Sequence, residues 1–173
     1  MCYTEEKSGL RQALFCIFQL LQYHFLAGCT KSYFQEVFPM SAVFHPEKDA
    51  ILAEVLGAYE FPATLLGAVR YGQGHINDTF CVICQPQEGD AVRFILQGLS
   101  SAAFPHPEEL MENFIGITSY LREKVIANGG DPLRETLSLV KTRDGKDFFT
   151  DENGKVWRLT PFIENTDCFQ SAT

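Results

Sequence analysis

Two segments of the chain, residues 45–61 and 106–130, carry apolar side chains at the spacing of an amphipathic α-helix. Each has a proline near its start, where a missing N–H is harmless, and each has glycine close to its end. The repeating apolar positions are Ile51, Leu52, Val55 and Leu56 in the first segment and Leu110, Phe114, Ile117 and Leu121 in the second. The pattern therefore predicts two helices.

Between these helices, residues 63–71, 78–85 and 91–99 have the composition of β-strands and are separated by short turns. After the second helix, residues 136–142 predict one more strand, and residues 146–164 predict a hairpin around an Asn-Gly turn. Consecutive strands that are joined by short turns pair antiparallel. We therefore predict an α+β fold, with an antiparallel five-stranded sheet, one inserted helix and further helices at the N-terminus.

The chain has 173 residues, of which 46% are hydrophobic and 21% charged. This composition is typical of one folded domain, with or without an extension. The formal net charge is −8, and Lys and Arg are not clustered along the sequence. Because proteins that bind the phosphates of nucleic acids rely on such clusters, we expect no nucleic-acid partner.

The six cysteines are scattered along the sequence and predict no disulfide framework. Cys81 and Cys84 form a C-x-x-C pattern, but they lie in a predicted strand, where residues three apart point to opposite faces. No second Cys or His pair follows at the spacing of a zinc site. We therefore expect buried or half-buried thiols and no metal site.

Residues 1–39 differ from the rest of the chain, because they contain three Lys or Arg and three Asp or Glu and are thus neutral. Within them, residues 10–29 are rich in Leu and Phe, but glutamines and a histidine interrupt the apolar run, which argues against a membrane span. We expect Met40 to be the natural start of a cytoplasmic protein and residues 40–173 to be its domain. The alternatives are a genuine amphipathic helix or a signal sequence with a lipid anchor at Cys29.

The stretch "RYGQGHINDTF", residues 70–80, places two glycines one residue apart between two predicted strands. A dinucleotide fold needs a helix after its glycine loop, whereas the β-branched and aromatic residues that follow here favour a strand. A glycine-rich hairpin covers the nucleotide phosphates in kinases, because glycine lets backbone N–H groups approach closely. The alternative is a structural hairpin whose glycines serve only the turn.

The predicted order from residue 64 to residue 166 is that of a kinase small lobe: strand, glycine loop, two strands, helix, two strands and a hinge. The stretches "YGQGHINDTF", "RFILQGL", "FPHPEELMEN" and "WRLTPFIENT" resemble the N-terminal lobe of the N-acetylhexosamine 1-kinases. That family belongs to the aminoglycoside phosphotransferase and choline kinase-like superfamily. The resemblance covers roughly residues 50–173, and the G-x-G-H-I-N loop and the F-I-E-x-T segment are its most specific parts.

This resemblance implies an ATP site in two parts. The glycine loop and the strands beside it would face the phosphates, and the segment after the last strand would be a hinge whose backbone groups pair with the adenine edge. The implied phosphate-side residues are Gly72, Gln73, Gly74, His75, Ile76, Asn77, Thr79 and Gln97. The implied adenine-side residues are Phe162, Ile163, Glu164 and Asn165.

Gln97 occupies the position at which protein kinases carry an ATP-binding lysine, and the similar sugar kinases also have Gln there. An amide can hydrogen-bond a phosphate oxygen but brings no charge. Arg93 lies on the same strand face and would be a source of charge, but we expect a solvated edge arginine. Asn77 is expected either to point at the phosphates or to cap the turn, and His75 either to touch a phosphate or the sugar or to face solvent. We expect Trp157 in the core.

The second predicted helix lies where kinases carry a glutamate that pairs with that lysine. Its candidates are Glu108, Glu109 and Glu112. Because Gln97 offers them no positive charge, we expect these side chains to form a solvated face.

Kinases of this superfamily need a second, helical lobe, which carries the catalytic aspartate and the magnesium-binding aspartate. The motifs for these residues do not occur between residues 40 and 173. We therefore expect no catalytic residue and no metal ligand here, and the chain resembles an N-terminal lobe truncated just after the hinge. The intact enzyme would bind ATP and Mg²⁺ and phosphorylate the anomeric hydroxyl of an N-acetylhexosamine. The alternatives are the same lobe of a choline, homoserine or aminoglycoside kinase, or a non-catalytic module that binds a nucleotide or a protein.

Overall fold

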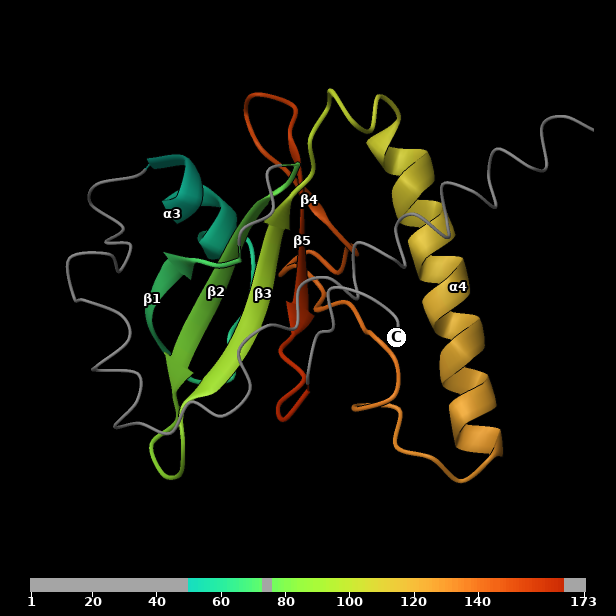
Figure 1. The fold of residues 1–173 in the computed structure, drawn as a ribbon. Coiled ribbons are helices and arrows are strands. Elements are labelled where there is room, and N and C mark those ends of the chain that lie inside the picture. The colour runs from blue at the N-terminus through green and yellow to red at the C-terminus, as the bar shows by residue number, and fades with distance from the viewer. Residues whose placement is uncertain (1–49, 73–75, 167–173) are drawn as a thin grey trace, which may run out of the picture.

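The computed structural model describes residues 50–72 and 76–166, which form two helices and five strands (Figure 1). In chain order these are α3 (Ala50–Gly57), β1 (Thr64–Arg70), β2 (Asp78–Gln85), β3 (Val92–Gly98), α4 (Pro107–Ala127), β4 (Phe149–Thr150) and β5 (Val156–Pro161). The three strands before α4, and α4 itself, closely match the segments that the hydrophobic pattern predicts. The predicted N-terminal helices, and the start of the helix predicted from residue 45, lie outside the described residues.

The five strands form one open antiparallel sheet in the order β1-β2-β3-β5-β4. The first three strands follow one another directly, whereas β5 comes after α4 and pairs with the other edge of β3. In the hairpin from β4 to β5, Gly154 of the predicted Asn-Gly turn has a φ of +77°, a conformation that glycine adopts readily. The described part of the chain is therefore an α+β fold with one helix inserted after the third strand, as predicted.

The prediction of a strand over residues 136–142 is wrong, because this segment forms no strand in the structure. It runs beside β5, and the N–H of Val140 donates a hydrogen bond of 2.9 Å to the carbonyl of Leu159. The neighbouring part of the same edge of β5 is taken by β4. Leu137 and Leu139 pack against residues on the α4 side of the sheet. The apolar pattern of the segment thus reflects packing and not a ladder of hydrogen bonds.

One face of the sheet packs against α3 (Figure 1). The helix contributes Leu52, Val55 and Leu56, three of its four predicted apolar positions, whereas Ile51 is 36% exposed. Trp157 belongs to the same cluster and lies in the core, as predicted. The sheet residues of this cluster are Ala68, Val82, Cys84, Phe94, Leu96, Trp157 and Leu159.

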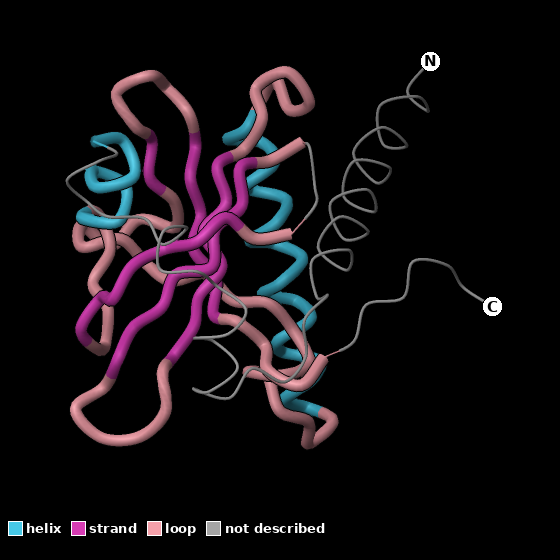
Figure 2. Tube along the Cα trace, turned by 60° about the vertical axis from the view of Figure 1, so that its left-hand side comes forward, coloured by secondary structure: helices cyan, strands magenta, loops and turns pink. Residues whose placement is uncertain are grey.

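The opposite face of the sheet packs against the first half of α4, so that the sheet lies between the two helices (Figure 2). Leu110 and Phe114 are buried there as predicted, but Leu121 is 41% exposed, since the buried residues of α4 all lie in its first half. Two buried clusters occupy this face. They contain Leu99, Phe104, Leu110, Met111, Phe114 and Val156 in the first, and Val69, Tyr71, Cys81 and Ile83 in the second.

Cys81 and Cys84 are buried, form no disulfide with another described residue and belong to clusters on opposite faces of the sheet, as their spacing predicts. Burial raises the pKa of the Cys84 thiol to about 11. Neither of the two described helices is long and apolar enough to cross a membrane.

Candidate functional site

The glycine-containing loop joins β1 to the antiparallel β2, so it is a hairpin connection, as predicted, and not the strand-to-helix turn of a dinucleotide fold. Gly72 has a φ of +80°, a conformation that residues with a side chain rarely adopt. Ile76 is 40% exposed. Gln73, Gly74 and His75 lie outside the described residues, and their phosphate contacts stay predictions.

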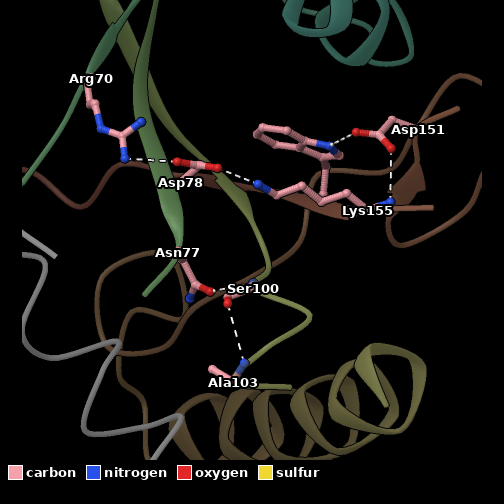
Figure 3. Close-up of polar contacts among 8 residues, drawn as sticks. Arg70, Asn77, Asp78, Ser100, Ala103, Asp151 and Lys155 are labelled. Carbon is pink, nitrogen blue, oxygen red and sulfur yellow. Dashed lines mark hydrogen bonds and ion pairs between the residues drawn. The ribbon is translucent and has the colours of Figure 1, made fainter. Parts of the chain in front are cut away.

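The two ends of this loop are joined by an ion pair (Figure 3). Arg70, the last residue of β1, lies with its Nη2 2.9 Å from Oδ1 of Asp78, the first residue of β2. The ammonium group of Lys155 binds the other carboxylate oxygen of Asp78. The hydrogen bond from Lys155 is the main reason why the pKa of Asp78 lies below its usual value, and Arg70 adds to this against the effect of burial. Asp78 thus fastens the loop to the β4–β5 hairpin.

Lys155 itself is held in place by Asp151, at the turn between β4 and β5 (Figure 3). Asp151 Oδ1 accepts hydrogen bonds of 2.9 Å from the N–H groups of Asn153 and Lys155, and its Oδ2 accepts one of 2.8 Å from Nε1 of Trp157. Burial raises the pKa of this carboxyl, but these hydrogen bonds outweigh burial and bring the pKa below its usual value. The buried carboxylate therefore fixes the turn of the hairpin that carries Lys155, the residue bound to Asp78.

Asn77 is buried at the end of the glycine loop. Its Oδ1 accepts a hydrogen bond of 3.0 Å from the N–H of Ser100, and Ser100 Oγ in turn accepts one of 3.4 Å from the N–H of Ala103 (Figure 3). Of the two roles expected for Asn77, neither describes this contact. The side chain ties the glycine loop to the connection between β3 and α4.

Thr79, Gln97 and Arg158 form a buried polar row across three adjacent strands, on the face of the sheet that α4 covers. Thr79 of β2 is opposite Gln97 of β3, and Gln97 is opposite Arg158 of β5. Gln97 Oε1 accepts hydrogen bonds of 3.1 and 2.9 Å from Nε and Nη2 of Arg158, and its Nε2 donates to Thr79 Oγ1 over 3.4 Å. The guanidinium also lies over the ring of Phe114 in α4, 4.5 Å from the centroid. Gln97 is therefore buried beside a positive charge.

Arg93 is not the solvated edge residue that the sequence predicts, since its side chain is only 10% exposed. Its Nε donates a hydrogen bond of 2.9 Å to Oε1 of Glu164, and its Nη2 binds Oε2 of the same carboxylate. The guanidinium lies over the ring of Phe162, 4.0 Å from the centroid. The prediction is wrong because the segment after β5 continues along β3 and supplies both partners.

Two contacts hold the predicted hinge, residues 162–166, in place. The N–H of Phe162 donates to the carbonyl of Arg93 over 3.1 Å, and Nη2 of Arg134 donates to the carbonyl of Glu164 over 3.2 Å. Asn165 has a φ of +55°, which turns the chain away from β5. No described residue accepts a hydrogen bond from the backbone N–H of Ile163 or Glu164. A backbone N–H without a described partner is the kind of donor that N1 of an adenine accepts.

The loop and the hinge meet through Tyr71 and Phe162, whose rings pack edge to face with centroids 5.9 Å apart. Tyr71 directly precedes Gly72, and its N–H donates a hydrogen bond of 2.9 Å to the carbonyl of Thr79. Of the predicted site residues, the structure thus brings Thr79, Gln97 and Phe162 to one side of the sheet.

Other features of the molecule lie apart from the glycine loop and the predicted hinge. Glu108, Glu109 and Glu112 are exposed on α4, as predicted. Within residues 50–72 and 76–166, no three His, Cys, Asp or Glu side chains gather at metal-binding distance. A cavity of about 310 Å³ lies beside α3, on the sheet face opposite Gln97, and is lined by Ala53, Leu56, Gly57, Tyr59, Phe61, Ala63, Leu65 and Arg143.

Sequence reasoning missed Arg158, the residue that determines the surroundings of Gln97. In "VWRLTP" it alternates with Trp157 and Leu159, so the strand period already places it on the face opposite the α3 core. The pairing of β5 with β3 could not be read from that period, and without it nothing connects Arg158 with Gln97.

A scan of the sequence against protein-family models finds no match. The likeness to the N-acetylhexosamine 1-kinases therefore rests on the motifs quoted above.

Proposed function

We propose that the described residues form the nucleotide-binding lobe of an ATP-dependent small-molecule kinase. The contact between Tyr71 and Phe162 carries this proposal, because it joins the loop that would cover the phosphates to the segment that would bind the base. The two segments are far apart in sequence, and only the antiparallel order of β1, β2, β3 and β5 brings them together.

The adenine ring would lie beside residues 162–165, where the backbone N–H groups of Ile163 and Glu164 provide donors. Arg93 and Arg134 hold this segment against the sheet, so a base would meet a preformed edge. Phe162 would contribute apolar surface near the ring. The side chain of Glu164 is engaged with Arg93, so its backbone, and not its carboxylate, is the part that would face the base.

The phosphates would lie under residues 72–77. The conformation of Gly72 gives the backbone a turn without a side chain in the way. Gln97 supplies a neutral donor at the base of this loop, next to the charge of Arg158. The resemblance assigns the magnesium ligands and the catalytic aspartate to a second lobe, and it makes the anomeric hydroxyl of an N-acetylhexosamine the acceptor.

The first test is an NMR titration of the ¹⁵N-labelled 173-residue chain with adenosine and with ATP. We expect weak binding, with a Kd on the order of 1 mM, because a single lobe provides half of the cleft. The resonances that ATP shifts should include Thr79, Gln97 and Ile163. Shifts that cluster elsewhere, or none at nucleotide concentrations well above this Kd, would refute the proposal.

A matched pair of glycine variants separates loop function from stability. Gly72 and Gly145 have nearly the same backbone conformation, with φ of +80° and +82°, but Gly145 lies in a turn away from the loop. Both Gly72→Ala and Gly145→Ala should strain the backbone to a similar degree. Only Gly72→Ala should weaken ATP binding. The acceptor is tested by assaying the complete gene product with N-acetylglucosamine, N-acetylgalactosamine and choline, and turnover of choline alone would reassign it.

A further inference from the structure

Arg158 and Gln97 form a pair in which the orientation of the amide is dictated by the charge beside it. A guanidinium has hydrogen-bond donors and no acceptor, so the group that Gln97 turns toward Arg158 has to be its oxygen. Two hydrogen bonds, of 3.1 and 2.9 Å, fix that oxygen. Rotating the amide by half a turn would lose both bonds and place its NH₂ group against a positive charge.

The NH₂ group of Gln97 consequently points the other way, toward β2. One of its hydrogens is directed at Oγ1 of Thr79, over a long distance of 3.4 Å. Among the residues that the structure describes, none accepts the second hydrogen. Thr79 lies two residues after Asn77, at the end of the glycine loop, so the donor end of the amide faces the base of that loop.

The buried charge also strengthens this donor. Arg158 stays ionised at any physiological pH, and the ring of Phe114 and the amide oxygen hold it in a site where it is 4% exposed. Hydrogen bonds that are accepted from a cation polarise an amide, and the effect is larger where water is excluded. The two hydrogen bonds from Arg158 therefore make the NH₂ group of Gln97 a stronger donor toward the loop.

We propose that Arg158 is a positioning residue that locks and polarises Gln97, so that its NH₂ group binds a phosphate oxygen of the nucleotide. This inference rests on the proposed function, because it needs a phosphate at the loop. It goes beyond that function by naming Arg158 as the residue that orients Gln97 as an uncharged hydrogen-bond donor toward a phosphate oxygen. Arg158 itself does not touch the ligand.

The decisive variant is Gln97→Glu. A carboxylate accepts the same two hydrogen bonds from Arg158 with charge assistance, and the hydroxyl of Thr79 can turn to donate, so the fold should persist. The variant has no N–H donor and adds a negative charge toward the phosphates. We expect its affinity for ATP to fall by about tenfold or more. Its affinity for adenosine should stay within about twofold of wild type, because the hinge is unchanged.

Arg158→Met removes the charge and the lock while it keeps an apolar stem of similar length. It should lower the preference for ATP over adenosine, and Arg158→Lys should restore part of that preference. Tyr59→Phe is the control, because it removes a buried hydrogen bond of 3.0 Å to the Trp157 carbonyl on the other face of the sheet. It should lower stability and leave the ratio of the two affinities unchanged.

The side-chain NH₂ resonance of Gln97, identified as the signal lost in Gln97→Glu, provides a direct readout. It should shift when tripolyphosphate or ATP is added to the wild-type chain, and not with adenosine. If the wild type binds neither ATP nor adenosine, the proposed function itself fails. A second outcome is that the wild type binds both ligands but this resonance does not move, or that the ratio of affinities in Gln97→Glu and Arg158→Met equals that of the wild type. In that case only the role of Arg158 and Gln97 is overturned.

Discussion

Tyr71 and Phe162 pack edge to face, with their ring planes at 82° and their centroids 5.9 Å apart. Tyr71 lies between the end of β1 and the glycine loop, and Phe162 is the first residue after β5. The contact lies on the face of the sheet that carries Thr79, Gln97 and Arg158. It therefore defines the side of the molecule on which a nucleotide would have to bind.

A double-mutant cycle with Tyr71→Leu and Phe162→Leu measures this contact. Both substitutions keep apolar volume but remove the ring geometry, so the cycle should show a coupling of about 0.5–1.5 kcal/mol in the free energy of unfolding. Urea denaturation of the four proteins gives this value. The cycle also cancels the contact of Phe162 with Arg93, since that contact is lost in both variants that carry Phe162→Leu. A coupling near zero would mean that the rings do not hold the two segments together.

Gly98→Ala should destabilise the fold by about 1–3 kcal/mol. A Cβ at this position would lie 2.8 Å from two ring carbons of Trp157. The indole has little freedom to move away, because its Nε1 is bonded to Asp151 over 2.8 Å and the ring is packed in the core.

Gly116 provides the opposite control for this prediction. It lies on the exposed side of α4, and a Cβ there would meet no atom within 4 Å. Gly116→Ala should raise the free energy of unfolding by roughly 0.5–1 kcal/mol, since alanine has the higher helix propensity. Thermal unfolding of both variants should shift the midpoint in opposite directions. A stable Gly98→Ala would show that Trp157 is not fixed.

The pattern of apolar residues predicted the strands and helices well where these residues belong to a strand of the sheet or to a helix face that packs on it. It failed at residues 136–142, where the same alternation comes from packing beside β5 and against the α4 cluster, and at Leu121, because only the first half of α4 contributes buried residues. The local pattern shows which residues are apolar. It does not show which edge or surface will receive them.

The candidate site was predictable where local sequence determines geometry, as in the turn at Gly72. It was not predictable where partners come from distant strands. Arg93 was expected in solvent because Glu164 and Phe162 could not be placed beside it, and the charge of Arg158 could not be connected with Gln97. The pairing of β3 with β5 decides both cases.

A second cycle, with Arg93→Met and Glu164→Gln, tests the contact that fixes the hinge. We expect a coupling of about 0.5–1 kcal/mol, because the pair is bidentate but the Glu164 side chain is 44% exposed. Arg93→Met alone should cost more, since it also loses the contact with Phe162. The matched control is the pair of Lys146 and Asp144, whose side chains are 73% and 60% exposed. Equal coupling in the two pairs would argue that Arg93 does not fix the hinge.

Cys84 should resist alkylation in the folded protein. Its thiol is fully buried, and its pKa of about 11 leaves little of the reactive thiolate near neutral pH. Peptide-level mass spectrometry after iodoacetamide treatment should find Cys84 unmodified under native conditions and modified in urea. Rapid modification of the native protein would show that the cluster between α3 and the sheet opens readily.

The ion pair at the base of the glycine loop makes stability depend on pH. The pKa of Asp78 in the folded protein is lowered, mainly by the hydrogen bond from Lys155, below a value of about 3.9 for an unfolded chain. Ionised Asp78 therefore stabilises the fold above that value, and this stabilisation is lost as the pH falls through the folded-state pKa. Asp78→Asn should lower the free energy of unfolding at neutral pH, and the difference from wild type should be smaller at an acidic pH well below about 3.9.

Urea denaturation at both pH values measures this effect. Glu88→Gln, in the exposed turn between β2 and β3, is the control and should differ from wild type by a similar small amount at both. Lys155→Met should reproduce most of the change seen in Asp78→Asn, because Lys155 makes the largest contribution to the lowered pKa. Arg70→Met should reproduce less of it, since the Arg70 side chain is 62% exposed. If Asp78→Asn is equally destabilising at both pH values, the carboxylate acts through packing and not through its charge.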